Sequence, residues 1–255
     1  MALARNSIDL NADTGERPLA LQDGSEEKLL RFVSSANVAC GGHAGDATSM
    51  KAVVQICRTL GVGLGAHPGY PDRAGFGRSK LEMPASQLEA SLIEQMRDLA
   101  EIAAASGLRV RHVKPHGALY NEASKNRELA TIIARSVAAV DHKFVLVGLA
   151  GSLMLEVWKT EGFHVIGEAF ADRRYEPDGS LRPRGFTDAL ITNPAEAAEQ
   201  ALRIASEGKI TAFDGTTFFV EAQTICLHSD TSNALQIASE IRLRLSAAGI
   251  EVTSF

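Results

Sequence analysis

Short apolar stretches alternate with longer segments of helical periodicity along this chain of 255 residues. Each apolar stretch ends in polar residues or glycine, and the segment that follows repeats its apolar residues every three or four positions. The alternation predicts seven strands, at residues 7–13, 35–40, 62–67, 110–116, 144–150, 164–172 and 224–230. It predicts helices at residues 25–34, 47–60, 85–106, 126–140, 152–161, 194–207 and 232–248. A further stretch, residues 209–222, contains an Asp-Gly pair between two β-rich runs and is predicted to be an inserted hairpin.

Polar residues within these strands fall on one face. Alternate strand residues share a face, so the first strand groups Asp9, Asn11 and Asp13 on one side. A parallel sheet covered by helices needs apolar residues on its outer face, so the polar sets must point inward. An open doubly wound sheet would gather its site from fewer strands. We therefore predict a single domain over residues 1–255, a seven-stranded parallel β/α (TIM-like) barrel with its chemistry at the C-terminal rim.

Composition and charge exclude several classes of protein. Hydrophobic residues make up 45% of the chain, which is ample for a core, and the net charge is −5. Nucleic-acid and anionic-membrane binding need a basic surface, so neither is expected. No apolar run reaches the ~20 residues that cross a bilayer, and the N-terminal residues lack a secretory signal. The three cysteines form no C-x-x-C pair, which favours a reducing cytoplasm over a disulfide scaffold or a cysteine-rich zinc site.

The first two strands lead into candidate chemistry. Inward carboxylates such as Asp9 and Asp13 need partners, either in catalysis or in an ion-pair network with Lys114. His43 lies in a glycine-rich loop rather than on an apolar face, which favours a functional role. Asp46, three residues later, has the position of a helix N-cap, and that structural role is the favoured one.

The third and fourth strands add basic residues. His67 ends the third strand and precedes a long rim loop. In that loop Arg73 and Arg78 either grip a carboxylate or phosphate or are solvated at the surface. His112 and His116 cannot share a metal ion, because four strand residues span ~13 Å. Lys114 is either an ion-pair partner of Asp13 or a cation for a substrate oxygen.

The last strands supply Asp172, Arg173 and His228, with Asp230 as a site residue or a helix cap. No phosphate loop of the G-x-x-x-x-G-K-[ST] type, no strand-linked G-x-G-x-x-G and no H-E-x-x-H is present. The mixture of carboxylates and imidazoles permits acid–base catalysis without metal, or catalysis with one divalent ion.

Eight segments together resemble the LamB/YcsF family. In chain order they are DLNADTGE (9–16), ANVACGGHAGD (36–46), GAHPGYPD (65–72), GFGR (75–78), VKPHGALYN (113–121), VGLAGS (147–152), FADR (170–173) and TICLHSDT (224–231). The resemblance covers nearly the whole chain, and the lysine–proline–histidine–glycine segment is the most distinctive.

The resemblance implies a barrel of the glycoside hydrolase/deacetylase type and an ATP-dependent hydrolase of a cyclic amide bond. The implied activity is that of 5-oxoprolinase, in which this chain would be the A component. That enzyme opens 5-oxo-L-proline to L-glutamate with Mg-ATP as cosubstrate. Subunits B and C are the implied partners, and the chain alone is expected to be inactive. Two alternatives stay open: a metal-dependent amidase or carbohydrate deacetylase, and a non-catalytic regulatory subunit that binds small acids.

The residues expected to carry the implied reaction come from six of the seven strands and their rim loops. The predicted catalytic residues are Asp13, His43, His67, Lys114 and His116. The predicted substrate-binding residues are Asn11, Arg73, Arg78, Tyr120, Asp172, Arg173 and His228. If a metal is bound, its expected ligands are Asp13, His43 and His67.

Overall fold

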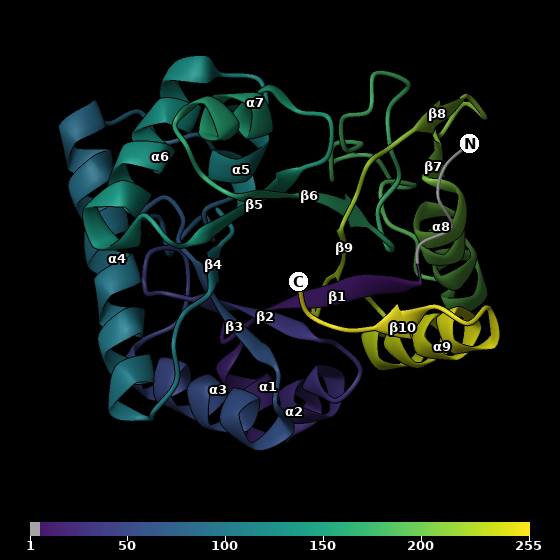
Figure 1. The fold of residues 1–255 in the computed structure, drawn as a ribbon, viewed down its shortest axis with the longest axis horizontal. Coiled ribbons are helices and arrows are strands. Elements are labelled where there is room, and N and C mark those ends of the chain that lie inside the picture. The colour runs from purple at the N-terminus through teal and green to yellow at the C-terminus, as the bar shows by residue number, and fades with distance from the viewer. Residues whose placement is uncertain (1–5) are drawn as a thin grey trace.

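Seven parallel strands close into a barrel in the computed structural model, which describes residues 6–255 (Figure 1). The barrel strands are β1 (Ser7–Thr14), β2 (Ser35–Ala39), β3 (Gly63–His67), β4 (His112–Val113), β5 (Val145–Leu149), β6 (Val165–Phe170) and β9 (Thr224–Leu227). They pair in that order, and β1 pairs with both β2 and β9, which closes the ring. The predicted seven-stranded parallel barrel is therefore confirmed.

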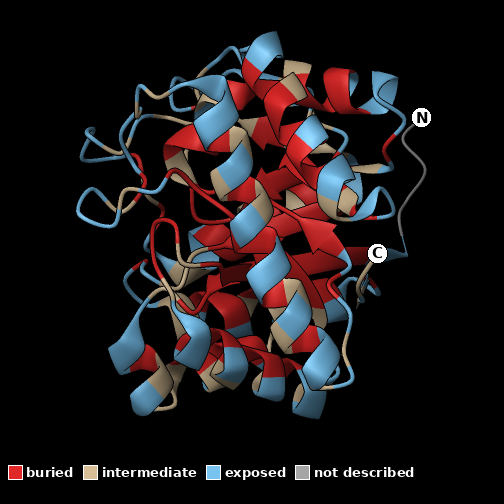
Figure 2. Cartoon of the chain, turned by 90° about the vertical axis from the view of Figure 1, so that its left-hand side faces the viewer, coloured by how far each residue is buried: buried red, intermediate tan, exposed pale blue. Residues whose placement is uncertain are grey.

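Helices surround the barrel on its outside (Figure 1). They are α1 (Pro18–Gln22), α2 (Ser25–Leu30), α3 (Ala47–Leu60), α4 (Ala85–Ala105), α5 (Gly117–Ala123), α6 (Arg127–Asp141), α7 (Leu153–Thr160), α8 (Pro194–Glu207) and α9 (Ala234–Ala247). Outward residues of β1 such as Leu10 and Ala12 are fully buried in the apolar layer between strands and helices. Figure 2 shows this arrangement as a buried interior beneath helices whose outer faces are exposed. Within residues 6–255, no helix is both long and apolar enough to span a membrane.

Local sequence signals account for the helix starts. Asp46 accepts hydrogen bonds from the amides of Thr48 and Ser49 and caps α3, in agreement with its favoured structural role. Asn193 caps α8, where Pro194 occupies the first turn. These caps fix where each helix leaves the loop that follows a barrel strand.

The structure differs from the expected elements at several places. Strand β4 is much shorter than the predicted stretch, although backbone bonds from Arg111 to Leu64 (2.7 Å) and from Lys114 to Ala66 (2.9 Å) extend its contact with β3. The two short helices α1 and α5 and the short strand β10 (Glu251–Val252) were not predicted. Strand β10 pairs with the start of β1 at Ser7 and Ile8. By contrast, strands β7 (Lys209–Thr211) and β8 (Thr217–Phe219) form an antiparallel pair outside the barrel, within residues 209–222 where an inserted hairpin is predicted.

Polar side chains fill much of the barrel interior. Three hydroxyls donate to the carboxylate of Asp9 in the lowest layer, from Ser34, Ser35 and Thr224. The next layer contains Asn11, Asn37, His112 and Glu168. Barrel interiors of this class are usually filled by branched apolar side chains. Here a stack of hydrogen-bonded polar groups leads up to the rim and supports the residues there.

Candidate active site

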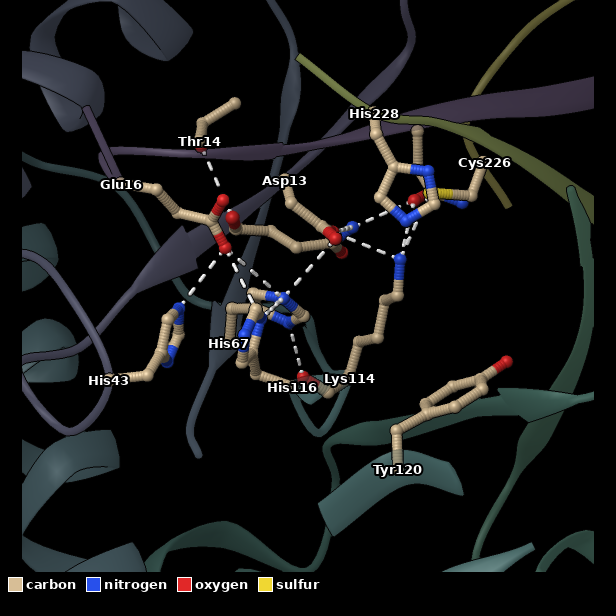
Figure 3. Close-up of polar contacts among 12 residues, drawn as sticks. Asp13, Thr14, Glu16, His43, His67, Lys114, His116, Tyr120, Cys226 and His228 are labelled. Atoms are coloured by element: carbon tan, nitrogen blue, oxygen red, sulfur yellow. Dashed lines mark hydrogen bonds and ion pairs between the residues drawn. The ribbon is translucent and has the colours of Figure 1, made fainter. Parts of the chain in front are cut away.

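Strand β1 delivers two carboxylates to the rim. Asp13 is the last inward residue of the strand, and its side chain is almost fully buried. Gly15 adopts a left-handed conformation (φ 73°), which turns the chain so that Glu16 lies back over the barrel (Figure 3). The Glu26 carboxylate accepts from the amide of Gly15 and holds this turn. The short connection therefore places Glu16 within reach of histidines from β3 and the loops after β2 and β4.

Lys114 is the centre of a buried ion-pair network. Its Nζ lies 2.9 Å from Asp13 Oδ1 and 3.1 Å from Cys226 Sγ (Figure 3). Glu168 Oε1 is also 2.9 Å from this nitrogen. Burial alone would lower the pKa of Lys114, but Asp13, Cys226 and Glu168 raise it well above its ordinary value. Burial alone would raise the pKa of Asp13, but His67 and Lys114 hold it well below its ordinary range. Asp13 and Lys114 are therefore both charged at neutral pH.

Three histidines gather around Glu16. His43 Nε2 lies 3.1 Å from Glu16 Oε1, and His116 Nδ1 lies 3.2 Å from the same oxygen. His67 Nε2 lies 2.9 Å from His116 Nδ1 and 3.3 Å from Asp13 Oδ2. The rings of His43 and His116 stack with centroids 3.5 Å apart. Burial lowers the pKa of His43 to about 3 and also lowers that of His116, so both imidazoles are neutral at pH 7.

His228 and Asp172 form a separate pair on the other side of the rim. The carboxylate of Asp172 accepts from the ring Nδ1 of His228 at 2.9 Å and from its backbone amide at 3.0 Å. The hydroxyl of Thr231 also donates to Asp172. Burial alone would raise the pKa of Asp172, but His228 and Thr231 lower it to about 2. An ionised Asp172 thus orients the His228 ring with Nε2 free for proton transfer.

A cavity of about 750 Å³ opens above these groups. Its lining includes Asp13, Glu16, His67, Lys114, His116 and His228. Arg173 also lines the cavity, and its guanidinium is buried with Nε unpaired. Burial and the nearby Arg184 lower the pKa of Arg173 only to about 10, so it stays cationic at neutral pH. In the described part of the chain, no carboxylate lies within ion-pair distance of Arg173.

An ion-pair group joins loops that line the cavity. Arg78, in the loop after β3, donates to the carboxylate of Asp230, in the loop after β9. Arg184 Nη1 lies 3.5 Å from the same carboxylate. Three loops that are distant in sequence are therefore joined at one acidic side chain.

Most of the predicted site residues meet in this cavity. Those that line it are Asp13, His67, Arg78, Lys114, His116, Tyr120, Arg173 and His228. Three others, Asn11, His43 and Asp172, lie behind the lining and bond to residues that form it. Arg73 lies elsewhere: its guanidinium donates to the backbone carbonyls of Gly41 (3.0 Å) and Gly45 (2.7 Å). The structure therefore gives Arg73 a role in holding the loop after β2 and does not bring it to the cavity.

Some residues of the site were not among the predicted ones. Glu168 shares an inward strand face with Asp172, and that alternation could have identified it. Glu16 lies just beyond the first strand, and its closeness in sequence to Asp13 could have added it to the predicted site residues. Arg184 comes from a long loop, where no periodic signal indicates the direction of a side chain.

The chain is similar in sequence and in structure to known proteins. The sequence profile of the LamB/YcsF family matches residues 8–255. The A component of 5-oxoprolinase from Chloroflexus aggregans is 51% identical over 246 residues, which cover 96% of this chain and 98% of that protein. The protein of the same name from Neisseria meningitidis serogroup A is 46% identical over 247 residues, covering 97% of this chain and 99% of that protein. The crystal structure of the lactam utilization protein from Thermus thermophilus matches with a TM-score of 0.89 at 40% identity, covering 98% of this chain and 100% of that one.

Proposed function

This chain belongs to the LamB/YcsF family, and on that premise we propose that it is the barrel component of an ATP-dependent 5-oxoprolinase. The proposed reaction converts 5-oxo-L-proline, ATP and two molecules of water to L-glutamate, ADP and phosphate. Relatives named as the A component of 5-oxoprolinase match over nearly their whole length, which supports the same role here. Because those relatives are named as one component of a larger enzyme, a complex is supported as well, and we propose subunits B and C as partners.

The observation that carries the proposal is the buried guanidinium of Arg173 in the cavity wall, whose Nη2 donates to the carbonyl oxygen of Arg182 while its Nε has no partner. A buried cation without an acidic partner is costly, so the site is suited to an anionic ligand that completes the pair. The carboxylate of 5-oxo-L-proline has the charge and the planar geometry that a guanidinium binds. We assign Arg173 to hold this carboxylate, which would point the lactam ring at the floor of the cavity.

The proposed chemistry at the lactam uses His228, Asp13 and Lys114. His228, oriented by Asp172, would accept a proton from the attacking water at Nε2 and deliver it to the ring nitrogen as the C–N bond breaks. Asp13 lines the cavity floor and would orient the attacking water. The ammonium of Lys114 already has Asp13, Glu168 and Cys226 around it, so it would act mainly as a fixed positive charge. Phosphoryl transfer from Mg-ATP is assigned to the complex, since the chain carries no phosphate loop.

The proposal is tested by measuring glutamate and phosphate release from 5-oxo-L-proline and Mg-ATP. The chain is assayed alone and with its B and C partners, and release is expected only in the full mixture. Arg173→Gln should raise KM for 5-oxo-L-proline by roughly 10–100-fold with a smaller change in kcat, because a charge-assisted hydrogen bond is lost. The control is Arg135→Gln, which removes an exposed guanidinium on α6. Absence of product in every mixture of folded proteins would refute the proposed activity.

A second candidate is a metal-dependent amidase or deacetylase that needs no ATP. The group of three imidazoles around the Glu16 carboxylate favours it, because such donors hold divalent ions in hydrolases. The same assay separates the two functions. Hydrolysis by the isolated chain without ATP would support the second candidate and contradict the first.

A further inference from the structure

We propose that Glu16, His67 and His116 form a binding site for one divalent transition-metal ion, for which Zn²⁺ is the best-matched probe. One ligand atom from each of these side chains lies within 4.8 Å of the other two. The site differs from the ligand set expected from the sequence, because Glu16 and His116 replace Asp13 and His43. Metal binding here is independent of the proposed 5-oxoprolinase activity.

Backbone carbonyls fix which ring nitrogens carry hydrogen. His67 Nδ1 lies 2.7 Å from the carbonyl oxygen of Lys114, and His116 Nε2 lies 3.0 Å from that of Phe76. A carbonyl oxygen only accepts, so these two nitrogens must donate. The opposite nitrogens, His67 Nε2 and His116 Nδ1, therefore present lone pairs when the rings are neutral. Imidazoles that bind metals are commonly held by this kind of second hydrogen bond.

The lone pairs of the site converge. His116 Nδ1 lies 2.9 Å from His67 Nε2 and 3.2 Å from Glu16 Oε1. Three acceptor atoms at such distances repel one another unless positive charge lies between them. A proton can bridge only two of these atoms, whereas one metal ion can bind all of them. His43 Nε2 lies 3.1 Å from Glu16 Oε1 and holds this carboxylate in place. The His43 ring is stacked parallel to the His116 ring, so an ion in the plane of one ring lies outside the plane of the other, and His43 is not a ligand.

The spacing of the donors suits a small metal ion. A tetrahedral zinc ion with ligands at ~2.0–2.2 Å places neighbouring ligands about 3.4 Å apart. The distances among the three donors, 2.9, 3.2 and 3.8 Å, lie on both sides of this value. Two nitrogen donors and one oxygen donor suit zinc and its neighbours in the first transition row. Asp13 Oδ2 also lies 3.3 Å from His67 Nε2, but Lys114 and Asn37 hold this carboxylate through its Oδ1.

The surrounding loops are shaped around the histidines. A Cβ on Gly77 would come within 2.8 Å of His43 Cβ, and one on Gly69 within 2.9 Å of His43 Nδ1. Phe76 adopts a left-handed conformation (φ 54°) that is uncommon for a residue with a bulky side chain, and its carbonyl accepts from His116. Glu16, His67 and His116 line the cavity, so an ion between them would border it.

The experiment measures metal binding directly. Purified protein is freed of metal with a chelator and desalted, and Zn²⁺ is titrated by calorimetry with metal content checked by mass spectrometry. We expect one ion per chain. Glu16→Gln, His67→Gln and His116→Gln should each weaken binding by at least about tenfold, because each removes a ligand. His142→Gln is the matched control, since His142 is an exposed imidazole that stacks on Phe163 away from the site.

A second readout reports the coordination geometry. Co²⁺ in place of Zn²⁺ should give visible absorption bands of a tetrahedral ion, and these bands should disappear in His67→Gln. Circular dichroism establishes that each variant is folded, and Glu16→Gln, which keeps the side-chain shape, decides the test if a histidine variant does not fold. Failure to bind any ion, or equal binding by native protein and folded Glu16→Gln, would overturn the proposal. Neither outcome affects carboxylate binding by Arg173, so the proposed function would stand or fall separately.

Discussion

Lys114 shows how a single buried residue can hold a barrel interior together. Its ammonium balances the carboxylates of Asp13 and Glu168, which come from strands β1 and β6. Both carboxylate side chains are buried, so neither has water to replace the lysine. Removing one member of a buried ionic group leaves an uncompensated charge, which costs more than the group contributes when intact.

We therefore predict that Lys114→Met lowers the free energy of unfolding by about 3–5 kcal/mol. Adding Glu168→Gln should recover part of that loss, because one of the two uncompensated carboxylates is then removed. Chemical denaturation of the single and double variants measures both effects. Lys51→Met, at an exposed position of α3, is the control and should change stability by less than about 0.5 kcal/mol. A loss no larger than that of the control would show that Lys114 does not hold the interior together.

At the scale of elements, the fit between β3 and β4 depends on one glycine. Gly65 pairs with His112 across the two strands, and a Cβ on Gly65 would come within 2.0 Å of His112 Nε2. The imidazole thus occupies the space that a side chain at position 65 would need. The His112 ring uses that position to reach Asn37 Oδ1 at 2.8 Å.

Gly65→Ala should destabilise the protein by roughly 1–3 kcal/mol, because the ring must move and its hydrogen bond is strained. Combining it with His112→Ser should make the alanine less costly than it is in the native background, since the small side chain leaves room. Thermal and chemical unfolding of the four proteins in this cycle measure the coupling. Gly185→Ala is the control, because a Cβ there meets nothing within 4 Å and the backbone needs no left-handed conformation. Purely additive effects would contradict the proposed steric conflict.

Elements whose sequence alternates strictly were predictable, and so were most site residues on them, although Glu168 on β6 was not among the predicted ones. The positions of Asp13, His67 and Lys114 follow from strand alternation, which fixes the face each side chain occupies. Loop residues were not predictable in this way, because no repeat fixes their direction. Arg73 illustrates this, since it bonds to two backbone carbonyls and does not enter the cavity. Glu16 enters because the left-handed Gly15 turns the chain, a conformation that sequence spacing alone does not reveal.

At the scale of the whole molecule, a polar interior makes stability depend on pH. Burial, with Lys114 nearby, lowers the pKa of His112 to about 3 from an ordinary value of 6.5. Between those pH values the unfolded chain binds a proton that the folded protein excludes. Stability from this group is therefore fully present above pH 6.5 and is lost as pH falls toward 3.

His112→Gln keeps an amide donor for Asn37 and removes the titrating group. The native protein should lose about 2 kcal/mol more than the variant between pH 8 and pH 5, because folding must exclude a proton from His112. Urea denaturation of both proteins across this range measures their free energies of unfolding. In the difference between the two pH profiles, the contributions of the other titrating groups largely cancel. Parallel pH profiles would show that His112 is not held neutral by the fold.

The Asp230 ion-pair group makes the contacts between the rim loops depend on salt. Its partners Arg78 and Arg184 belong to different loops, and the Arg78–Asp230 side chains are partly exposed to solvent. Mobile ions screen such pairs over a Debye length of ~10 Å at 0.1 M, while buried pairs such as Lys114–Asp13 are screened much less. Rising ionic strength therefore weakens the contacts between the rim loops before it disturbs the barrel beneath. The ion pairs between these loops and those inside the barrel thus respond differently to the surrounding solution.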